Sequence, residues 1–114
     1  MSAELTSGSV EPTFSTVVER LESGILIHVS GEIDVATCGG LRDAIEPHLG
    51  PSQDVVLDLS KVTFMDSSCL AVLVQARGQL TADGGSLVLR NPSTVAQRLL
   101  SLTNLEDLLD AEST

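Results

Sequence analysis

Four segments of the chain carry the residue pattern of β-strands. The first mixes polar and apolar residues as an edge strand does, and a turn at Ser23-Gly24 leads into the second, which predicts a hairpin. The third begins with a β-branched pair and has the short apolar run of a central parallel strand, and the fourth has the pattern of another buried strand. The expected strands are 14–21, 25–33, 54–62 and 86–90.

Three further segments have apolar residues at the spacing of a core-facing helix stripe. They are residues 37–49, 70–80 and 91–105. Pro47 is expected to shorten or kink the first of them near its end. The side chains predicted to face the core are Leu41, Ile45 and Leu49 in the first helix, Leu70, Leu73, Val74 and Leu80 in the second, and Val95, Leu99 and Leu102 in the third.

The order of these elements predicts the fold class. Strands that alternate with helices of this length need crossover connections, which produce a mostly parallel sheet. The opening hairpin makes the sheet mixed, and residues 106–114 could add one short last strand. We therefore expect an α/β domain over 14–114, with a four- to five-stranded sheet and helices packed against it. Residues 1–13, rich in Ser, Thr, Gly and Pro, are expected to form a flexible lead-in.

Composition and charge narrow the function. The chain has 114 residues, a net charge of −10 and 2% aromatic residues, so phosphate backbones and anionic lipids would be repelled. The longest apolar run, Cys69–Val74, is too short to span a bilayer, and the first residues lack the pattern of a signal peptide. These features predict a cytoplasmic protein that binds neither nucleic acid nor membrane, with Cys38 and Cys69 as free thiols.

An acidic and hydroxyl-rich motif, Asp66-Ser67-Ser68, lies between the third expected strand and the second expected helix. One such side chain is explained as a helix N-cap, because the first N–H groups of a helix need acceptors. Capping does not require a second Ser beside it, at the carboxyl end of a strand where open α/β sheets place ligand sites. The motif is therefore a candidate functional site.

Two chemical roles are open to a Ser of this motif, as a nucleophile or as a substrate. A nucleophilic Ser would need the Gly-x-Ser-x-Gly turn and a general base, but the flanking residues differ, and His28 and His48 are placed as structural residues in a strand and at a helix end. We therefore expect no catalytic residue and no enzyme activity. As a substrate, the Ser would gain about 1.5–2 negative charges on phosphorylation. Repulsion of that charge by an acidic partner could act as an off-switch.

The motifs resemble a known family. "GEIDVAT" (31–37) and "VVLDLSKVTFMDSSCLAVL" (55–73), in this order and at this separation, resemble the anti-sigma factor antagonists of bacterial partner-switching systems, whose fold is the STAS domain. The resemblance runs from residue 14 to 109 and includes "TVAQRLLSLTNLEDLL" (94–109), which is similar to the third helix of the family and the segment after it.

The resemblance implies a function and partners. The protein would bind an anti-sigma factor of the histidine-kinase-like ATPase type and so free a sigma factor. That anti-sigma factor would also be a serine kinase that cancels the interaction, and a metal-dependent serine phosphatase would restore it. Ser68 matches the phosphorylated residue of the family. Asp66 and Ser67 would shape the turn that faces the kinase, and Asp34 and Cys69 would belong to the same partner-binding surface.

The sequence departs from the family pattern in two places. Cys69 stands where Gly usually follows the phosphorylated Ser, and its side chain is expected to narrow the approach of a kinase loop. The chain also ends before the closing helix that many members carry, which could favour a homodimer. A STAS-type scaffold or sensor that is never phosphorylated is therefore the alternative function.

The cysteines, the histidines and a glycine pair offer other possible chemistry. Cys38 and Cys69 both follow strands whose ends a parallel sheet would bring together, so redox control is an alternative to two ordinary reduced side chains. A zinc site from the two Cys and two His lacks ligand spacing. Gly39-Gly40 could approach a phosphate at a helix start, but no Walker-type Lys follows. No cofactor or metal is expected.

Overall fold

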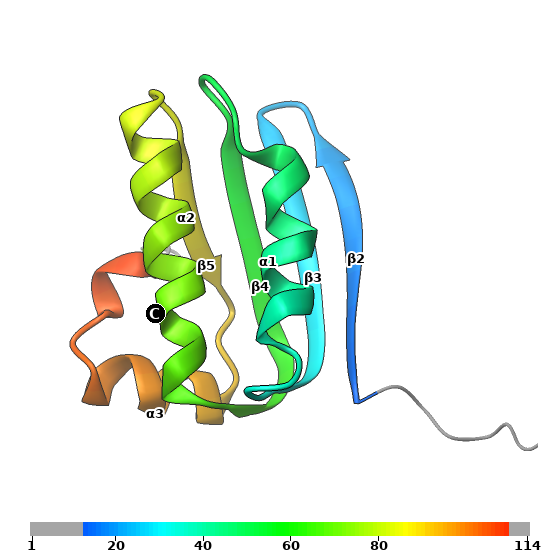
Figure 1. The fold of residues 1–114 in the computed structure, drawn as a ribbon, viewed down its shortest axis with the longest axis vertical. Helices are drawn as coiled ribbons and strands as arrows, with labels where there is room; N and C mark the ends of the chain where they lie inside the picture. Colours follow the sequence, from blue (N-terminus) through cyan, green and yellow to red (C-terminus); the bar gives the residue numbers. More distant parts are fainter. Residues whose placement is uncertain (1–12, 110–114) are drawn as a thin grey trace, which may run out of the picture.

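The computed structural model describes residues 13–109 of the chain. Four strands form one sheet in the order β2-β3-β4-β5 (Figure 1). Strand β2 is antiparallel to β3, while the β3–β4 and β4–β5 pairs are parallel. The predicted mixed sheet with its N-terminal hairpin is therefore confirmed. The strands are β2 (Phe14–Leu21), β3 (Gly24–Ile33), β4 (Asp54–Met65) and β5 (Ser86–Arg90).

The three predicted helices are also present. They are α1 (Cys38–Ile45), α2 (Leu70–Ala82) and α3 (Thr94–Leu102). Pro47 lies in a short 3-10 helix, Glu46–His48, that ends α1, as its fixed φ and missing N–H require. Within residues 13–109, no helix combines the length and the apolar composition needed to cross a membrane.

The end of the described chain differs from the expectation of a last strand. Glu106–Leu108 form a 3-10 helix, and Leu109 makes an isolated parallel bridge with Leu89. The rest of the predicted strand lies outside the described residues. The flexible lead-in predicted over 1–13 also lies outside them, apart from residue 13.

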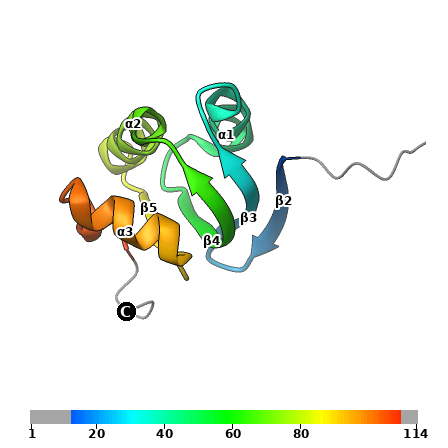
Figure 2. The same cartoon turned by 90° about the horizontal axis from the view of Figure 1, so that it is seen from below.

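The core lies between the sheet and its helices. Figure 2 shows α1 and α2 on one side of the sheet and α3 on the other, beside β4 and β5. Alternate residues of β5, of the first half of β4 and of most of β3 are buried in the core, which follows from the two-residue period of a strand, whereas the edge strand β2 has no buried residue. The fully buried strand side chains include Ile27, Ile33, Leu57, Leu59 and Leu89, and those from helices include Leu41, Leu73, Leu80 and Leu100.

Two of the predicted helix faces were partly wrong. Val74 is 48% exposed, Val95 40% and Leu102 75%. In α3 the residues that pack are Ala96 and Leu100, which are fully buried. Each of these two helices has apolar residues on more than one stripe, so periodicity alone does not determine which face packs against the sheet. The short Ala96 side chain allows α3 to lie close to the sheet, which favours burial of the stripe that contains Ala96 and Leu100.

Strand β4 runs three residues further than predicted, to Met65. Phe64 pairs with Glu32, and Met65 pairs with Ile33. The ladder continues because β3 extends equally far and supplies partners for these residues. Asp66 therefore follows the last paired residue of the strand directly.

Candidate functional site

The Asp-Ser-Ser motif and the Asp34 loop lie side by side. Parallel pairing of β3 and β4 ends at Ile33 and Met65, and the Asp66 N–H donates to the carbonyl oxygen of Ile33 over 2.8 Å. The connections that follow the two strands therefore start at the same level of the sheet, at the lower end in Figure 1. We call these connections, Asp34–Thr37 and Asp66–Cys69, the β3–β4 edge.

Asp66 organises the turn that leads into α2. Its backbone is extended, at φ −85° and ψ 137°, so the chain leaves the strand before it coils. Its Oδ1 accepts the N–H of Ser68 over 2.8 Å and the Ser68 hydroxyl over 2.8 Å. The backbone bond and then the hydroxyl bond lower the pKa of the Asp66 carboxyl, because both stabilise its ionised form. The capping interpretation is therefore correct for Asp66.

Ser68 carries an exposed hydroxyl that is hydrogen-bonded within the turn. Both Ser67 and Ser68 are exposed to solvent, and Ser68 is the one whose hydroxyl donates to the Asp66 carboxylate. In the part of the chain that the structure describes, neither histidine is a partner of this hydroxyl, and His28 instead bonds to Glu19 over 3.1 Å. The arrangement gives Ser68 a carboxylate neighbour and open access, without the histidine of a Ser-His pair.

Asp34 is held in a reciprocal pair of hydrogen bonds. Its Oδ1 accepts the N–H of Thr37 over 3.0 Å, and its own N–H donates to the Thr37 hydroxyl oxygen over 2.8 Å. That hydroxyl also lies 2.8 Å from the carbonyl oxygen of Glu32, to which it can donate. Sequence reasoning missed Thr37, because the capping box places Ser or Thr first and Glu or Gln three residues later, which is the reverse of the order here. Asp34 thus fixes the loop in addition to placing an acid on the edge.

Exposed apolar side chains flank the β3–β4 edge. Val35 is 72% exposed within the Asp34 loop, and Phe64 is 46% exposed just before the motif. Met65 and α3 line a hollow of about 330 Å³. Sequence reasoning missed this surface because it placed Val95 and Leu102, which line the hollow, in the core. Such exposed apolar groups favour contact with another protein.

The two cysteines are joined in a disulfide, so the prediction of free thiols was wrong. Their Cα atoms are 5.4 Å apart, which is within the range that a disulfide spans without backbone movement. Cys38 opens α1 and Cys69 ends the turn before α2, so the parallel register of β3 and β4 brings them together. The prediction of free thiols rested on the redox compartment, which carries no information about this register.

The Cys69 side chain does not narrow the approach to Ser68, contrary to expectation. It is fully buried, and its sulfur lies 3.2 Å from the carbonyl oxygen of Asp34. The side chain therefore points beneath the edge, while the Ser68 hydroxyl remains on the surface. Cys69 was predicted to belong to the partner-binding surface, but its side chain is buried beneath that surface.

In the glycine pair at the start of α1, Gly40 has a packing explanation, whereas a Cβ on Gly39 would meet nothing within 4 Å. A Cβ on Gly40 would lie 2.8 Å from a ring carbon of Phe14, which is closer than real Cβ contacts allow. Gly40 therefore makes room for the Phe14 ring beside α1. Among residues 13–109, no group of three or more His, Cys, Asp or Glu side chains is arranged to hold a metal ion.

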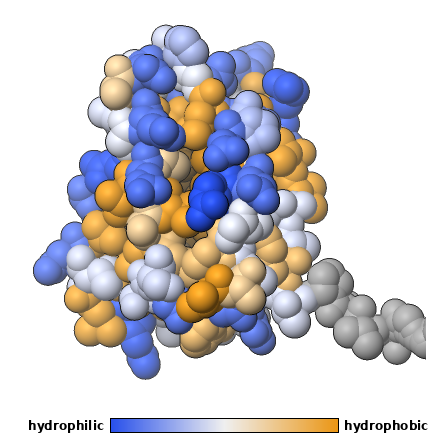
Figure 3. All heavy atoms as spheres, viewed as in Figure 1, coloured by the Kyte–Doolittle hydropathy of each residue, from blue (hydrophilic) through white to orange (hydrophobic). Residues whose placement is uncertain are grey.

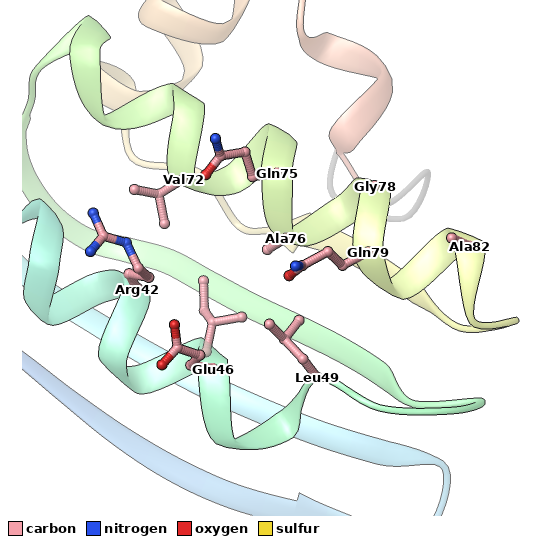
Figure 4. Close-up of a pocket in the computed structure, with 10 residues that line it drawn as sticks. Arg42, Glu46, Leu49, Val72, Gln75, Ala76, Gly78, Gln79 and Ala82 are labelled. Atoms are coloured by element: carbon pink, nitrogen blue, oxygen red, sulfur yellow. The ribbon is translucent and has the colours of Figure 1, made fainter.

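A second surface feature is a groove between α1 and α2. Its volume is about 620 Å³, and Figure 3 shows hydrophobic atoms between the two helices with hydrophilic residues beside them. Arg42 lines the groove from α1 and Glu46 from the short 3-10 helix after it, while Gln75 and Gln79 line it from α2 (Figure 4). Its apolar residues are Ile45, Leu49, Val72, Ala76 and Ala82. The groove holds none of the residues of the β3–β4 edge.

Known proteins are similar to this chain in sequence and in fold. The family model described as "Mlab, STAS domain" matches residues 16–110. The anti-sigma-B factor antagonist of Bacillus subtilis strain 168 is 36% identical over 93 residues, which are 82% of this chain and 85% of that protein. A crystal structure of an anti-sigma factor antagonist from Mycobacterium paratuberculosis is 34% identical, with a TM-score of 0.69, and the match covers 84% of this chain and 82% of that one.

A more distant likeness supports the fold alone. The anti-sigma factor antagonist SpoIIAA in its unphosphorylated form aligns with a TM-score of 0.73 at 21% identity, over 84% of this chain and 86% of that one. A Bacillus SpoIIAA structure in the phosphorylated form aligns with a TM-score of 0.67. The family model covers most of the sequence, and its relatives share both sequence and fold. This chain therefore belongs to the STAS-domain family.

Proposed function

We propose that this chain is an anti-sigma factor antagonist that docks through the β3–β4 edge and is switched off by phosphorylation of Ser68. Binding to the anti-sigma factor frees a sigma factor for transcription. The anti-sigma factor is a serine kinase of the histidine-kinase-like ATPase type, and a serine phosphatase reverses its action. The protein acts in the cytoplasm as a binding module and not as an enzyme.

One observation carries this proposal. The Ser68 hydroxyl is exposed on the first turn after β4, where it donates to Asp66 over 2.8 Å. The motif resembles the phosphorylated Asp-Ser-Ser element of the family, and the antagonist role of the relatives at 36% and 34% identity supports the same reading. Asp34 and the exposed Val35 lie on the same edge, which supplies the acidic and apolar contacts of a docking surface.

Phosphorylation would change this surface through charge and through a lost hydrogen bond. Esterification removes the proton that Ser68 donates to Asp66, and it places a doubly charged group beside that carboxylate. For a carboxylate of the partner about 5 Å away, each added unit charge costs roughly 3 kcal/mol at an effective dielectric constant near 20. That cost corresponds to about a hundredfold loss of affinity. One such contact is enough for an off-switch.

The net charge of −10 also bears on the partner. Outside the single carboxylate assumed opposite Ser68, an acidic surface of this kind associates fastest with a basic partner surface, and such electrostatic attraction raises the association rate more than the final affinity. We therefore expect association with the anti-sigma factor to slow as salt is added. The exposed apolar groups beside Ser68 would then supply the short-range contacts that keep the complex together.

The test is a pull-down with four forms of the protein: wild type, Ser68→Ala, Ser68→Glu and Gln79→Glu. Captured proteins are identified by mass spectrometry, and the affinity of the purified anti-sigma factor is then measured. We expect wild type, Ser68→Ala and Gln79→Glu to bind alike. Ser68→Glu should bind at least roughly tenfold more weakly, because one close charge contact exceeds the 1.4 kcal/mol that this ratio requires.

The Gln79→Glu form is the matched control, because it adds the same charge further along α2 in the α1–α2 groove. Equal binding by Ser68→Ala and Ser68→Glu would contradict the switch. Incubation with the captured kinase and ATP adds a second readout. Ser67→Ala should accept phosphate and Ser68→Ala should not. A wild-type protein that binds but takes up no phosphate would favour the alternative of a STAS-type scaffold or sensor.

A further inference from the structure

The Cys38–Cys69 disulfide ties together the two halves of the β3–β4 edge. Cys69 follows Ser68 directly, and the Cys38 N–H donates to the carbonyl oxygen of Asp34 over 2.9 Å. The Asp66 N–H donates to the carbonyl oxygen of Ile33 over 2.8 Å, so one backbone hydrogen bond also joins the start of the Ser68 turn to the end of β3. Among the residues described, the disulfide is thus the covalent link between the Ser68 turn and the Asp34 loop.

We propose that Cys38 and Cys69 form a reversible redox pair whose disulfide restrains the Ser68 turn and slows its phosphorylation. This inference rests on the proposed function, because it assigns a regulator to the same site. In the reduced state the Cys69 thiol has an acceptor, since its sulfur lies 3.2 Å from the carbonyl oxygen of Asp34. The buried Cys69 sulfur therefore has a partner in both states, which is Cys38 in the disulfide and the carbonyl oxygen of Asp34 in the dithiol. Neither state requires the backbone of the β3–β4 edge to rearrange.

The burial of the two cysteines sets the order of the chemistry. Cys38 is partly buried, while Cys69 is fully buried. A peroxide therefore reaches Cys38 first. The Cys38 thiol loses its proton and the thiolate attacks one peroxide oxygen. The O–O bond breaks, and the leaving hydroxide takes up the thiol proton as water, which gives a sulfenic acid. The Cys69 thiol then attacks the Cys38 sulfur, the S–S bond forms and a second water leaves.

The cycle balances and can be reversed. Oxidation takes two electrons and two protons from the thiols and reduces one peroxide to two waters. A dithiol reductant returns two electrons and two protons by attacking the disulfide, through a mixed disulfide, and is itself oxidised to a disulfide. In a reducing cytoplasm a disulfide is usually transient and often senses oxidants, which favours a switch over a permanent link.

The disulfide acts on phosphorylation because phosphoryl transfer depends on positioning. A kinase must draw the Ser68 hydroxyl away from Asp66 and align it with the γ-phosphate. The disulfide at Cys69, the residue after Ser68, holds this turn against the Asp34 loop. A misplacement on the order of 1 Å can cost about 10²-fold in rate. Docking, by contrast, uses the surface as it stands, so we expect the disulfide to leave binding to the anti-sigma factor in place.

The first experiment needs no partner. The protein is equilibrated in buffers of reduced and oxidised dithiothreitol, and hydrogen peroxide is added to the reduced form. Intact mass should report the reversible loss of two hydrogen atoms. NMR should show the Ser68 and Cys69 amides exchanging with solvent roughly tenfold more slowly in the disulfide form, since local opening sets exchange rates. Failure to form or to reduce the disulfide in the folded protein, or equal exchange, would overturn the proposal.

The second experiment measures phosphate transfer by the captured anti-sigma factor. Oxidised wild type should be phosphorylated roughly ten- to a hundredfold more slowly than reduced wild type. Cys38→Ser is the matched control, because it changes one atom and keeps Ser68 and Cys69. Its rate should equal that of reduced wild type and should not respond to peroxide. Equal rates in oxidised and reduced wild type would overturn the inference and leave the proposed function intact.

The two proposals fail separately. If the reduced protein binds the anti-sigma factor but takes up no phosphate, the proposed phosphorylation switch is wrong. The amide exchange of the Ser68 turn then still decides whether the disulfide restrains it. If the rate of Cys38→Ser depends on peroxide, the effect comes from another group and the assignment to this pair is wrong.

Discussion

Reduction of the Cys38–Cys69 disulfide should lower the free energy of unfolding. The link joins residues 31 apart in the sequence. A disulfide restricts the unfolded chain, and the loop-closure entropy for a loop of this length corresponds to about 3.7 kcal/mol at 25 °C. The reduced protein gains a hydrogen bond from the Cys69 thiol to Asp34, but a thiol is a weak donor and offsets little of this loss. The melting temperature should fall by roughly 15–30 °C.

Urea unfolding of the oxidised and the reduced protein measures this difference directly. The m-value should be smaller for the oxidised form, because a cross-linked unfolded chain exposes less surface. Cys38→Ser should match the reduced wild type and should not change when a dithiol is added. Together these three samples separate the cross-link from any effect of the reductant itself.

A difference below about 1 kcal/mol would refute the reasoning, because loop closure alone predicts several times that amount. It would mean that the unfolded chain already keeps these segments close or that the folded disulfide form is less stable than its contacts indicate. A large difference without a change in m-value would also contradict the entropic account and would place the effect in the folded state.

Two further predictions concern the turn and two glycines. Ser68→Ala removes one of the two bonds that lower the pKa of Asp66, so NMR titration should give a higher Asp66 pKa in this variant, and an unchanged value would contradict the assigned cause. A carboxyl whose pKa is lowered in the folded state stabilises the protein at pH values above its unfolded pKa of about 3.9. This contribution is lost as the pH falls through the folded pKa. The contribution of this carboxyl to the difference in free energy of unfolding between wild type and variant should therefore vanish in acid. Gly78→Ala should raise stability by about 1 kcal/mol, because a Cβ there meets nothing within 4 Å. Gly85→Ala should lower the melting temperature, because its Cβ would collide with the carbonyl oxygen of Gln53, and shifts of the same sign in both variants would count against this reading.

Much of the candidate site could be predicted because it belongs to one short segment. Asp66, Ser67 and Ser68 are adjacent in sequence, and a strand before and a helix after them place the motif at the carboxyl edge of the sheet. Their roles in docking and phosphorylation remain predictions. The reciprocal bonds of Asp34 with Thr37 and the exposure of Val35 could not be predicted, because they depend on how a loop folds back between two strands.

The sequence alone determined the elements, their order and the mixed, mostly parallel sheet, because periodicity and turn residues act over a few positions. Tertiary structure decided which stripe of α3 is buried, since Ala96 and Val95 lie on competing stripes and only contact with the sheet separates them. It also decided that Cys38 meets Cys69, because their distance depends on the register of β3 against β4. Register and packing join residues far apart in the chain, and a local pattern carries no information about them.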